Sequence, residues 1–152
     1  MSRQPDSGIV ENFFRRDGRL NRLRYFKRNV VLFVVELIIL TVITTVGTND
    51  LDEFSQGSLI VFRVFYIAGL IPFCCLMIRR LHDLDMNETL AYVFFALSFV
   101  TVFIDGKDML KVEPSSLENV LDTVACIINL YTLFWPGTNG DNSYGSDPLK
   151  AT

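Results

Sequence analysis

The chain has 152 residues, of which 50% are hydrophobic and 20% are charged, and its formal net charge is −3. This length favours one domain, and the charged fraction lies below the quarter or so that is typical of soluble domains. Nearly all of the charges fall in five segments that are separated by four apolar runs, and these runs leave no polar face for water. The pattern therefore argues against the alternative of a soluble all-α protein and predicts an all-α integral membrane protein.

The first part of the chain is predicted to be a disordered N-terminus, residues 1–8, followed by a basic arm. Ile9, Val10, Phe13 and Phe14 gather on one side of a helical wheel, and Arg15 lies away from this stripe. Such a pattern predicts an N-terminal interfacial amphipathic helix in the membrane surface. The alternative is a soluble amphipathic helix that packs on its own domain.

Four transmembrane helices are predicted, at about residues 30–46, 59–78, 89–104 and 119–135, within a single membrane domain of residues 9–149. At 1.5 Å per residue, the first and third are slightly short for a hydrocarbon core of about 30 Å. Pro72 lies inside the second and is expected to kink it. A Gly- and Asn-rich tail, residues 136–152, follows the last helix.

The distribution of Lys and Arg predicts the orientation of these helices. The basic arm directly precedes the first helix, whereas the loop after this helix carries Asp50, Asp52 and Glu53 and no Lys or Arg. By the positive-inside rule the N-terminus is cytoplasmic. Four crossings then place the segment of residues 79–87 and the C-terminal tail on the cytoplasmic side as well.

No cofactor, metal site or catalytic group is predicted. Cys74, Cys75 and Cys126 lie in apolar helices without metal-ligand spacing, and we expect them to be small buried side chains. The tail lacks the spacing of a calcium loop. His82 and Asp83 are neighbours on a helix and point about 100° apart, which is unfavourable for a catalytic dyad. An enzyme is therefore the least favoured class.

Three motifs of this chain resemble those of a bacterial inner-membrane family. They are residues 18–26 (GRLNRLRYF), residues 79–83 (RRLHD), and the tail pattern from Pro136-Gly137-Thr138 through Asn142 and Tyr144-Gly145 to Pro148. The family is known as domain of unknown function 805 and includes the YhaH-like membrane proteins. Residues 85–89 depart from the Gly, Ser and Trp pattern that is usual there. The resemblance implies a location and a helix count, and it implies no activity.

The predicted topology brings all three motifs to the cytoplasmic face, where we expect them to form one polar cap. Asp83 is expected to pair with an arginine of the arm, and His82 to meet the tail. Arg79 and Arg80 are interpreted as anchors that bind lipid phosphate. The residues predicted to contact lipid or a partner are Arg19, Arg22, Arg24, Arg79, Arg80, His82, Asp83, Asn142 and Tyr144.

Three further ionisable residues, Glu36, Arg63 and Asp122, lie inside predicted spans, where charge is costly. Arg63 and Asp122 lie near the outer ends of their helices and could form an ion pair, or extend outward toward water. Glu36 lies near mid-depth. Its expected role is an interhelical hydrogen bond, and the alternative is a proton-coupled or solute-contacting group.

The sequence therefore predicts a multi-pass protein of the bacterial cytoplasmic membrane with both termini in the cytoplasm. Its predicted function is a non-catalytic membrane interaction or regulatory module. The predicted partners are anionic lipid headgroups, together with a possible protein partner or homo-oligomer, and nucleic acid is not among them. The alternative is a small oligomeric transporter or channel subunit that uses Glu36.

Overall fold

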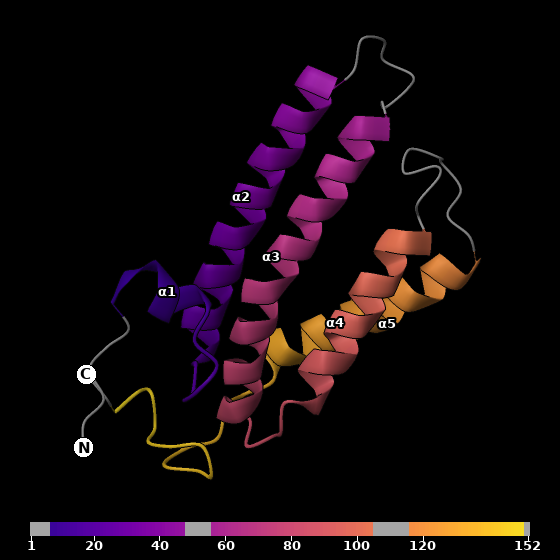
Figure 1. Ribbon diagram of the computed structural model, residues 1–152. Helices are drawn as coiled ribbons and strands as arrows, with labels where there is room; N and C mark the ends of the chain where they lie inside the picture. Colours follow the sequence, from indigo (N-terminus) through magenta and orange to yellow (C-terminus); the bar gives the residue numbers. More distant parts are fainter. Residues whose placement is uncertain (1–6, 48–55, 105–115, 151–152) are drawn as a thin grey trace.

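The computed structural model describes residues 7–47, 56–104 and 116–150, and within them the regular structure is helical. The predicted disorder of residues 1–8 falls almost wholly outside these ranges, as do the connections at residues 48–55 and 105–115. Figure 1 shows five helices in chain order: α1 (Gly8–Phe13), α2 (Arg22–Gly47), α3 (Gln56–Asp83), α4 (Thr89–Ile104) and α5 (Ser116–Phe134).

The two longest helices, α2 with 26 residues and α3 with 28, are long and apolar enough to cross a membrane. At 1.5 Å per residue they extend about 39 and 42 Å, which exceeds a hydrocarbon core of about 30 Å. The helix α2 begins at Arg22, so the prediction of a first helix at 30–46 missed its basic first two turns. The predicted interfacial helix is thereby divided, because only residues 8–13 form a separate helix, α1.

The predicted end of the second helix at residue 78 is too early, because α3 continues through Pro72 and the first part of the charged segment of residues 79–87 and ends at Asp83. The side chains of residues 79–83 are buried, and protein groups replace the water that their polar atoms would otherwise contact. A turn follows in which the backbone N–H groups of Leu84 and Met86 both donate to the Leu81 carbonyl. Asp85 takes the left-handed conformation there, with φ at 59°.

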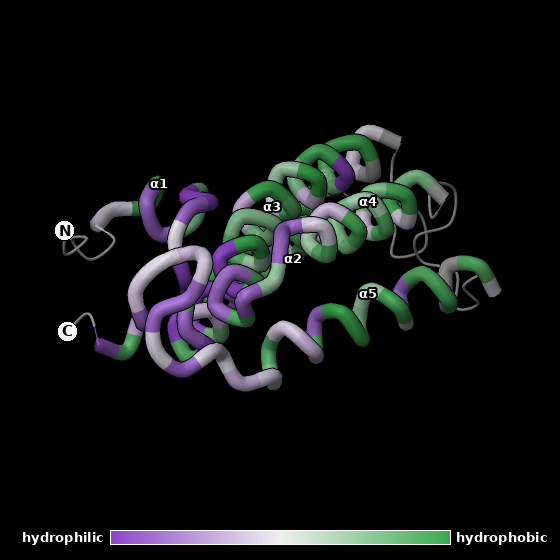
Figure 2. The backbone as a smooth tube through the Cα atoms, turned by 90° about the horizontal axis from the view of Figure 1, so that it is seen from below, coloured by the Kyte–Doolittle hydropathy of each residue, from purple (hydrophilic) through white to green (hydrophobic). Residues whose placement is uncertain are grey.

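The shorter helices α4 and α5 complete the bundle. The helix α4 has the predicted bounds 89–104, and α5 occupies 116–134 in place of the predicted 119–135. Helices α2 and α3 lie side by side, α4 packs between α3 and α5, and α5 returns to α2 at the end where the polar segments gather (Figures 1 and 2).

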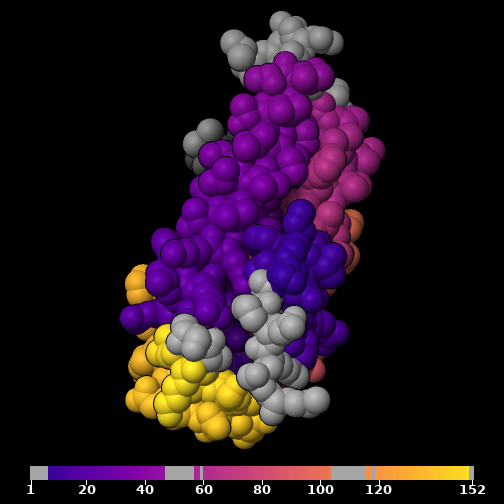
Figure 3. Space-filling model, turned by 90° about the vertical axis from the view of Figure 1, so that its left-hand side faces the viewer, coloured from indigo at the N-terminus to yellow at the C-terminus, as the bar shows by residue number. Residues whose placement is uncertain are grey.

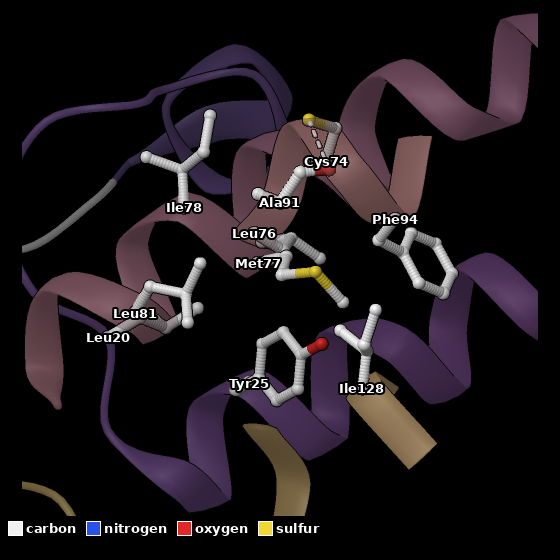
Figure 4. Packing of buried hydrophobic residues seen from close by; sticks show 10 residues of the cluster. All are labelled: Leu20, Tyr25, Cys74, Leu76, Met77, Ile78, Leu81, Ala91, Phe94 and Ile128. Atoms are coloured by element: carbon white, nitrogen blue, oxygen red, sulfur yellow. Dashed lines mark hydrogen bonds between the residues drawn. The ribbon is translucent and has the colours of Figure 1, made fainter. Parts of the chain in front are cut away.

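The buried core lies at the same end of the bundle as the polar segments. Figure 4 shows its side chains, which come from the arm, α2, the second half of α3, the first half of α4, and α5: Leu20, Tyr25, Cys74, Leu76, Met77, Ile78, Leu81, Ala91, Phe94 and Ile128. Elsewhere the helices are apolar on the outside, and none of the apolar stretch of α2 is buried within the chain. Such surfaces are suited to contact with lipid.

A substitution at Leu81 tests whether this core stabilises the polar end of the bundle. Its side chain is 0% exposed, and its truncation to Ala removes buried apolar area and leaves a cavity. We expect Leu81→Ala to lower the free energy of unfolding by about 2–5 kcal/mol. Denaturant unfolding in detergent can be followed through Trp135, the single tryptophan. Leu23→Ala is the control, since Leu23 is 61% exposed; equal losses for both variants would contradict the assignment.

Candidate functional site

The three motif segments meet at one end of the helices and form a polar structure that we call the cap. It consists of residues 14–21, the end of α3 from Arg79 to Asp83, and the tail of residues 135–150. The first and last of these segments lie at the same end of the molecule (Figure 3), and hydrophilic residues gather there (Figure 2). Segments far apart in the sequence therefore build one local structure.

Asp83 is the centre of the cap, because its carboxylate binds two arginines from different segments. Its Oδ1 accepts a hydrogen bond from Arg19 Nε at 3.1 Å, and Arg19 Nη2 lies 3.1 Å from the same oxygen. Its Oδ2 accepts from Arg80 Nη1. All three side chains are almost completely buried. The prediction that Asp83 pairs with an arginine of the arm is confirmed.

Arg19 also connects the arm to the tail. Its Nη1 donates to the carbonyl of Gly140 at 2.5 Å and lies 3.3 Å from that of Gly145. Its Nη2 donates to the Thr138 carbonyl at 2.7 Å and to Thr138 Oγ1 at 3.1 Å. A planar guanidinium is suited to this arrangement, because its donors diverge in fixed directions. Every donor of Arg19 that contacts the tail therefore meets an acceptor.

Arg80 connects α3 to the end of α5. Its Nε donates to the Thr132 carbonyl at 2.8 Å, and its Nη2 donates to the Trp135 carbonyl. The last carbonyls of a helix have no partner within the helix and carry partial negative charge, so a cation is stabilised there. With a side chain 0% exposed, Arg80 has no contact with solvent.

The tail approaches Asp83 closely because residue 137 is glycine. A Cβ at Gly137 would lie 2.9 Å from Asp83 Cγ and still nearer to Oδ2, so any side chain would displace the carboxylate. The next residue fixes the approach, since the N–H and Oγ1 of Thr138 donate to the Asp83 carbonyl at 2.8 and 3.0 Å. The tail is thus bound to both the backbone and the side chain of Asp83.

His82 meets the tail as predicted. Its ring stacks on the Tyr144 ring, with centroids 4.0 Å apart and planes at 9°. Its Nδ1 lies 3.2 Å from the Gly18 carbonyl; a carbonyl only accepts, so this hydrogen bond requires the proton on Nδ1. Asn142 Nδ2 donates to the His82 carbonyl at 2.8 Å. His82 and Asp83 thus have different partners.

The tail is organised around Asp147, which sequence reasoning missed. Its carboxylate accepts from the N–H groups of Gly140 at 3.1 Å and Leu149 at 2.9 Å. These donors favour the ionised form and hold the pKa of Asp147 below its usual value. Gly140 and Gly145 have positive φ, at 81° and 133°, which glycine adopts without strain. The many Gly, Asn and Asp residues of the tail were the sequence feature that could have indicated this turn structure.

Arg79 and Arg80 do not fit the expectation that they bind lipid phosphate. Arg80 is enclosed as described, and Arg79 is 4% exposed, with its Nη1 directed at the Glu11 carbonyl at 3.3 Å. The Arg79 carbonyl also accepts from the Leu20 N–H at 3.0 Å, which joins α3 to the arm. Positive charge in a sequence shows neither burial nor exposure, so these two residues were misassigned.

Exposed basic side chains remain at the start of α2. Arg22, Arg24 and Lys27 are exposed, and Leu23 and Phe26 lie exposed between them. We call these five residues the basic rim. Arg22 Nη1 reaches the Phe134 carbonyl at 3.5 Å, so one side of the rim adjoins the end of α5.

The predicted ion pair of Arg63 and Asp122 is not formed among the residues that the structure describes. Arg63 lies near the start of α3 and Asp122 near the start of α5, and α5 diverges from α3 toward that end (Figures 1 and 2). The depths of the two residues were predicted, but the sequence does not show which helices face one another. Asp122 is exposed.

Glu36 lies at the contact between α2 and α3. Its carboxyl group rests against Gly69, where a Cβ would lie 3.3 Å from Glu36 Cδ and nearer still to Oε1. The expected role of Glu36 was an interhelical hydrogen bond, whereas what is observed is a position between two helices. Over residues 7–47, 56–104 and 116–150, Glu36 takes part in none of the hydrogen bonds or ion pairs.

The long apolar helices, the apolar outer surface and the polar cap at one end together define an all-helical membrane protein. The family model "Protein of unknown function (DUF805)" matches residues 13–146. The chain therefore belongs to this family of membrane proteins of unknown function.

Two curated relatives agree with this assignment. Inner membrane protein YhaI from Escherichia coli K12 is 24% identical over 140 residues, which cover 92% of this chain and 91% of the relative. The protein of the same name from Escherichia coli O157:H7 matches to the same extent. No solved structure matches the chain significantly.

Asp83→Asn tests the central ion pairs. The change leaves two buried guanidinium groups without a counter-ion, and we expect it to lower the free energy of unfolding by about 3–5 kcal/mol. Thermal unfolding in detergent measures the effect. Asp85→Asn is a matched control, since Asp85 is exposed and Asn tolerates its positive φ. Similar stability of Asp83→Asn and the control would refute the central role of Asp83.

Proposed function

We propose that this protein is a non-catalytic interaction module of the bacterial cytoplasmic membrane, with a cytoplasmic cap whose basic rim binds anionic lipid headgroups. The observation that carries the proposal is the division of basic side chains into two sets. Arg19 and Arg80 are buried and hold the cap together, whereas Arg22, Arg24 and Lys27 are exposed on its outside. In the second set, Arg22 reaches the Phe134 carbonyl at 3.5 Å, and the side chains of Arg24 and Lys27 make no hydrogen bond or ion pair within the described residues.

The length of α2 supports a position of the rim at the membrane surface. Its 26 residues exceed the roughly 20 needed to span the hydrocarbon core by about 9 Å. If the excess lies at the basic end, residues 22–27 reach headgroup level. Leu23 and Phe26 then enter the acyl boundary, and the cations between them meet phosphate. At about 1 kcal/mol per basic residue, three of them favour anionic lipid by about 3 kcal/mol.

Four membrane crossings with both termini in the cytoplasm are part of the proposal. The arm and the tail contact each other in the cap, and this contact supports an even number of crossings. Helices α4 and α5 have 16 and 19 residues, about 24 and 28 Å, and are short for a full span unless the bilayer thins. The basic arm favours the cytoplasmic orientation.

Reporter fusions test this topology. We expect alkaline phosphatase to be active when fused within residues 48–55 or 105–115, and green fluorescent protein to be fluorescent when fused after Asn87 or at the C-terminus. These fusions distinguish four crossings from two, because α2 and α3 are the helices of the described residues that are long and apolar enough to cross a membrane. Inactive phosphatase within residues 105–115 would show that α4 and α5 remain on the cytoplasmic side.

Native mass spectrometry of protein released gently from its own membrane tests the lipid site. We expect the wild type to retain phosphatidylglycerol or cardiolipin over phosphatidylethanolamine. The triple variant Arg22→Gln, Arg24→Gln, Lys27→Gln should lose this preference by roughly a hundredfold, which corresponds to about 3 kcal/mol.

The control variant keeps the charge of the rim: Arg22→Lys, Arg24→Lys and Lys27→Arg. It should retain anionic lipid, since binding at a headgroup site of this kind depends more on charge than on side-chain shape. Unchanged lipid retention in the neutralised variant would contradict the proposal. A bound protein that the neutralised variant loses would instead assign the rim to a protein partner.

A second candidate is a small oligomeric transporter or channel subunit. The observation that favours it is Glu36, an ionisable group deep in a membrane span that rests against a second helix. Several copies are required, because four short helices enclose little space. Loss of a solute flux in Glu36→Gln liposomes, with the neutralised rim variant still active, would favour this candidate over the cap.

A further inference from the structure

The contact of Glu36 with α3 occurs at the backbone. Gly69 has no side chain, so the carboxyl group lies directly on the main chain of α3. On α2 no other acidic or basic side chain occurs between Arg28 and Gly47. The contact therefore places a single ionisable group against the backbone of a neighbouring span.

The backbone of α3 lacks one helical N–H donor near this contact. Pro72 lies inside α3, and proline has no N–H to donate to the carbonyl four residues earlier, which is that of Ala68. The Ala68 carbonyl belongs to the peptide unit that leads into Gly69. A carbonyl without its helical donor is costly in an apolar environment and favours a donor from elsewhere.

We propose that Glu36 and the Ala68 carbonyl form a proton-binding site at the contact of α2 and α3. With the proton bound, the carboxyl O–H donates to the Ala68 carbonyl, and both groups are satisfied. Without the proton, a carboxylate faces a carbonyl, and two acceptors oppose each other. Binding of one proton therefore favours the packing of α2 on α3, and release of this proton disfavours it. The inference does not depend on lipid binding at the cap.

The charged groups on the packed helices do not supply a counter-ion. On α3, Arg63 lies six residues before Gly69, about 9 Å along the axis, and Arg79 lies about 15 Å beyond it within the cap. The other titratable groups of this part of α3 are Tyr66, Cys74 and Cys75, which are neutral at pH 7. The α5 groups Asp122 and Cys126 are exposed. A proton is thus the available means of neutralising Glu36.

Infrared spectroscopy of the full-length protein in liposomes tests the site. At pH 7 we expect a carbonyl band of a protonated carboxylic acid that shifts when glutamate is labelled with ¹³C and that is lost in Glu36→Gln. The band should be unchanged in Asp122→Asn, the matched control on α5. Pro72→Ala restores an N–H donor to the Ala68 carbonyl, so the band should shift toward that of a weakly hydrogen-bonded acid.

Each outcome decides a separate step. Absence of a glutamic acid band in the labelled wild type would overturn proton binding at Glu36. This result comes from the wild type alone, so poor folding of a variant could not explain it. A band that is present but unchanged in Pro72→Ala would overturn the assignment of Ala68 as the acceptor. Loss of the band on raising the pH, together with an increased distance between spin labels on α2 and α3, would support the coupling to packing. An unchanged distance would overturn this coupling.

Discussion

The cap depends on one carboxylate that is shared by two buried guanidinium groups. Taking three charges out of water costs several kcal/mol per ion, and the arrangement is stable only when the remaining donors are satisfied. Arg19 and Arg80 meet this condition through backbone carbonyls of the tail and of α5. The arm, α3, α5 and the tail are therefore all positioned by Asp83, and the hydrophobic core directly above shields the charges from solvent.

The molecule has two parts in which different forces hold the helices. At the cap end, buried apolar side chains and ion pairs act as in a soluble domain. Along the spans, the apolar surface faces outward, and helix contacts depend on close approach at small residues such as Gly69. Because α2 and α3 are longer than a hydrocarbon core, they extend from the second environment into the first. The cap is thus continuous with the two spans and is no separate domain.

Much of this architecture could be predicted from the sequence, for identifiable reasons. The bounds of α4 follow from polar residues on both sides of an apolar run. The pairing of Asp83 with an arginine of the arm followed from charge and topology together, and the structure identifies this arginine as Arg19. The end of α3 was placed too early because Arg79 and Arg80 are charged, and only tertiary contacts show that they are buried. The ion pair of Arg63 and Asp122 was expected wrongly because the sequence does not show which helices face one another. The carbonyl partners of Arg80 could not be predicted, because every residue has a backbone carbonyl and the sequence does not show which one accepts.

The partners of Arg19 lie 64 residues away at Asp83 and 119 residues away at Thr138. This spacing has a consequence for biosynthesis, because the ribosome releases the tail last. Until then Arg19 lacks the carbonyls of the tail and the Asp83 carbonyl lacks its donors from Thr138, so the cap closes only after every helix has been made. A chain whose arm and tail lay on opposite sides of a membrane would leave the cap open. Closure of the cap thus requires that both segments reach the same side, and an open cap leaves the guanidinium group of Arg19 without its acceptors in the tail.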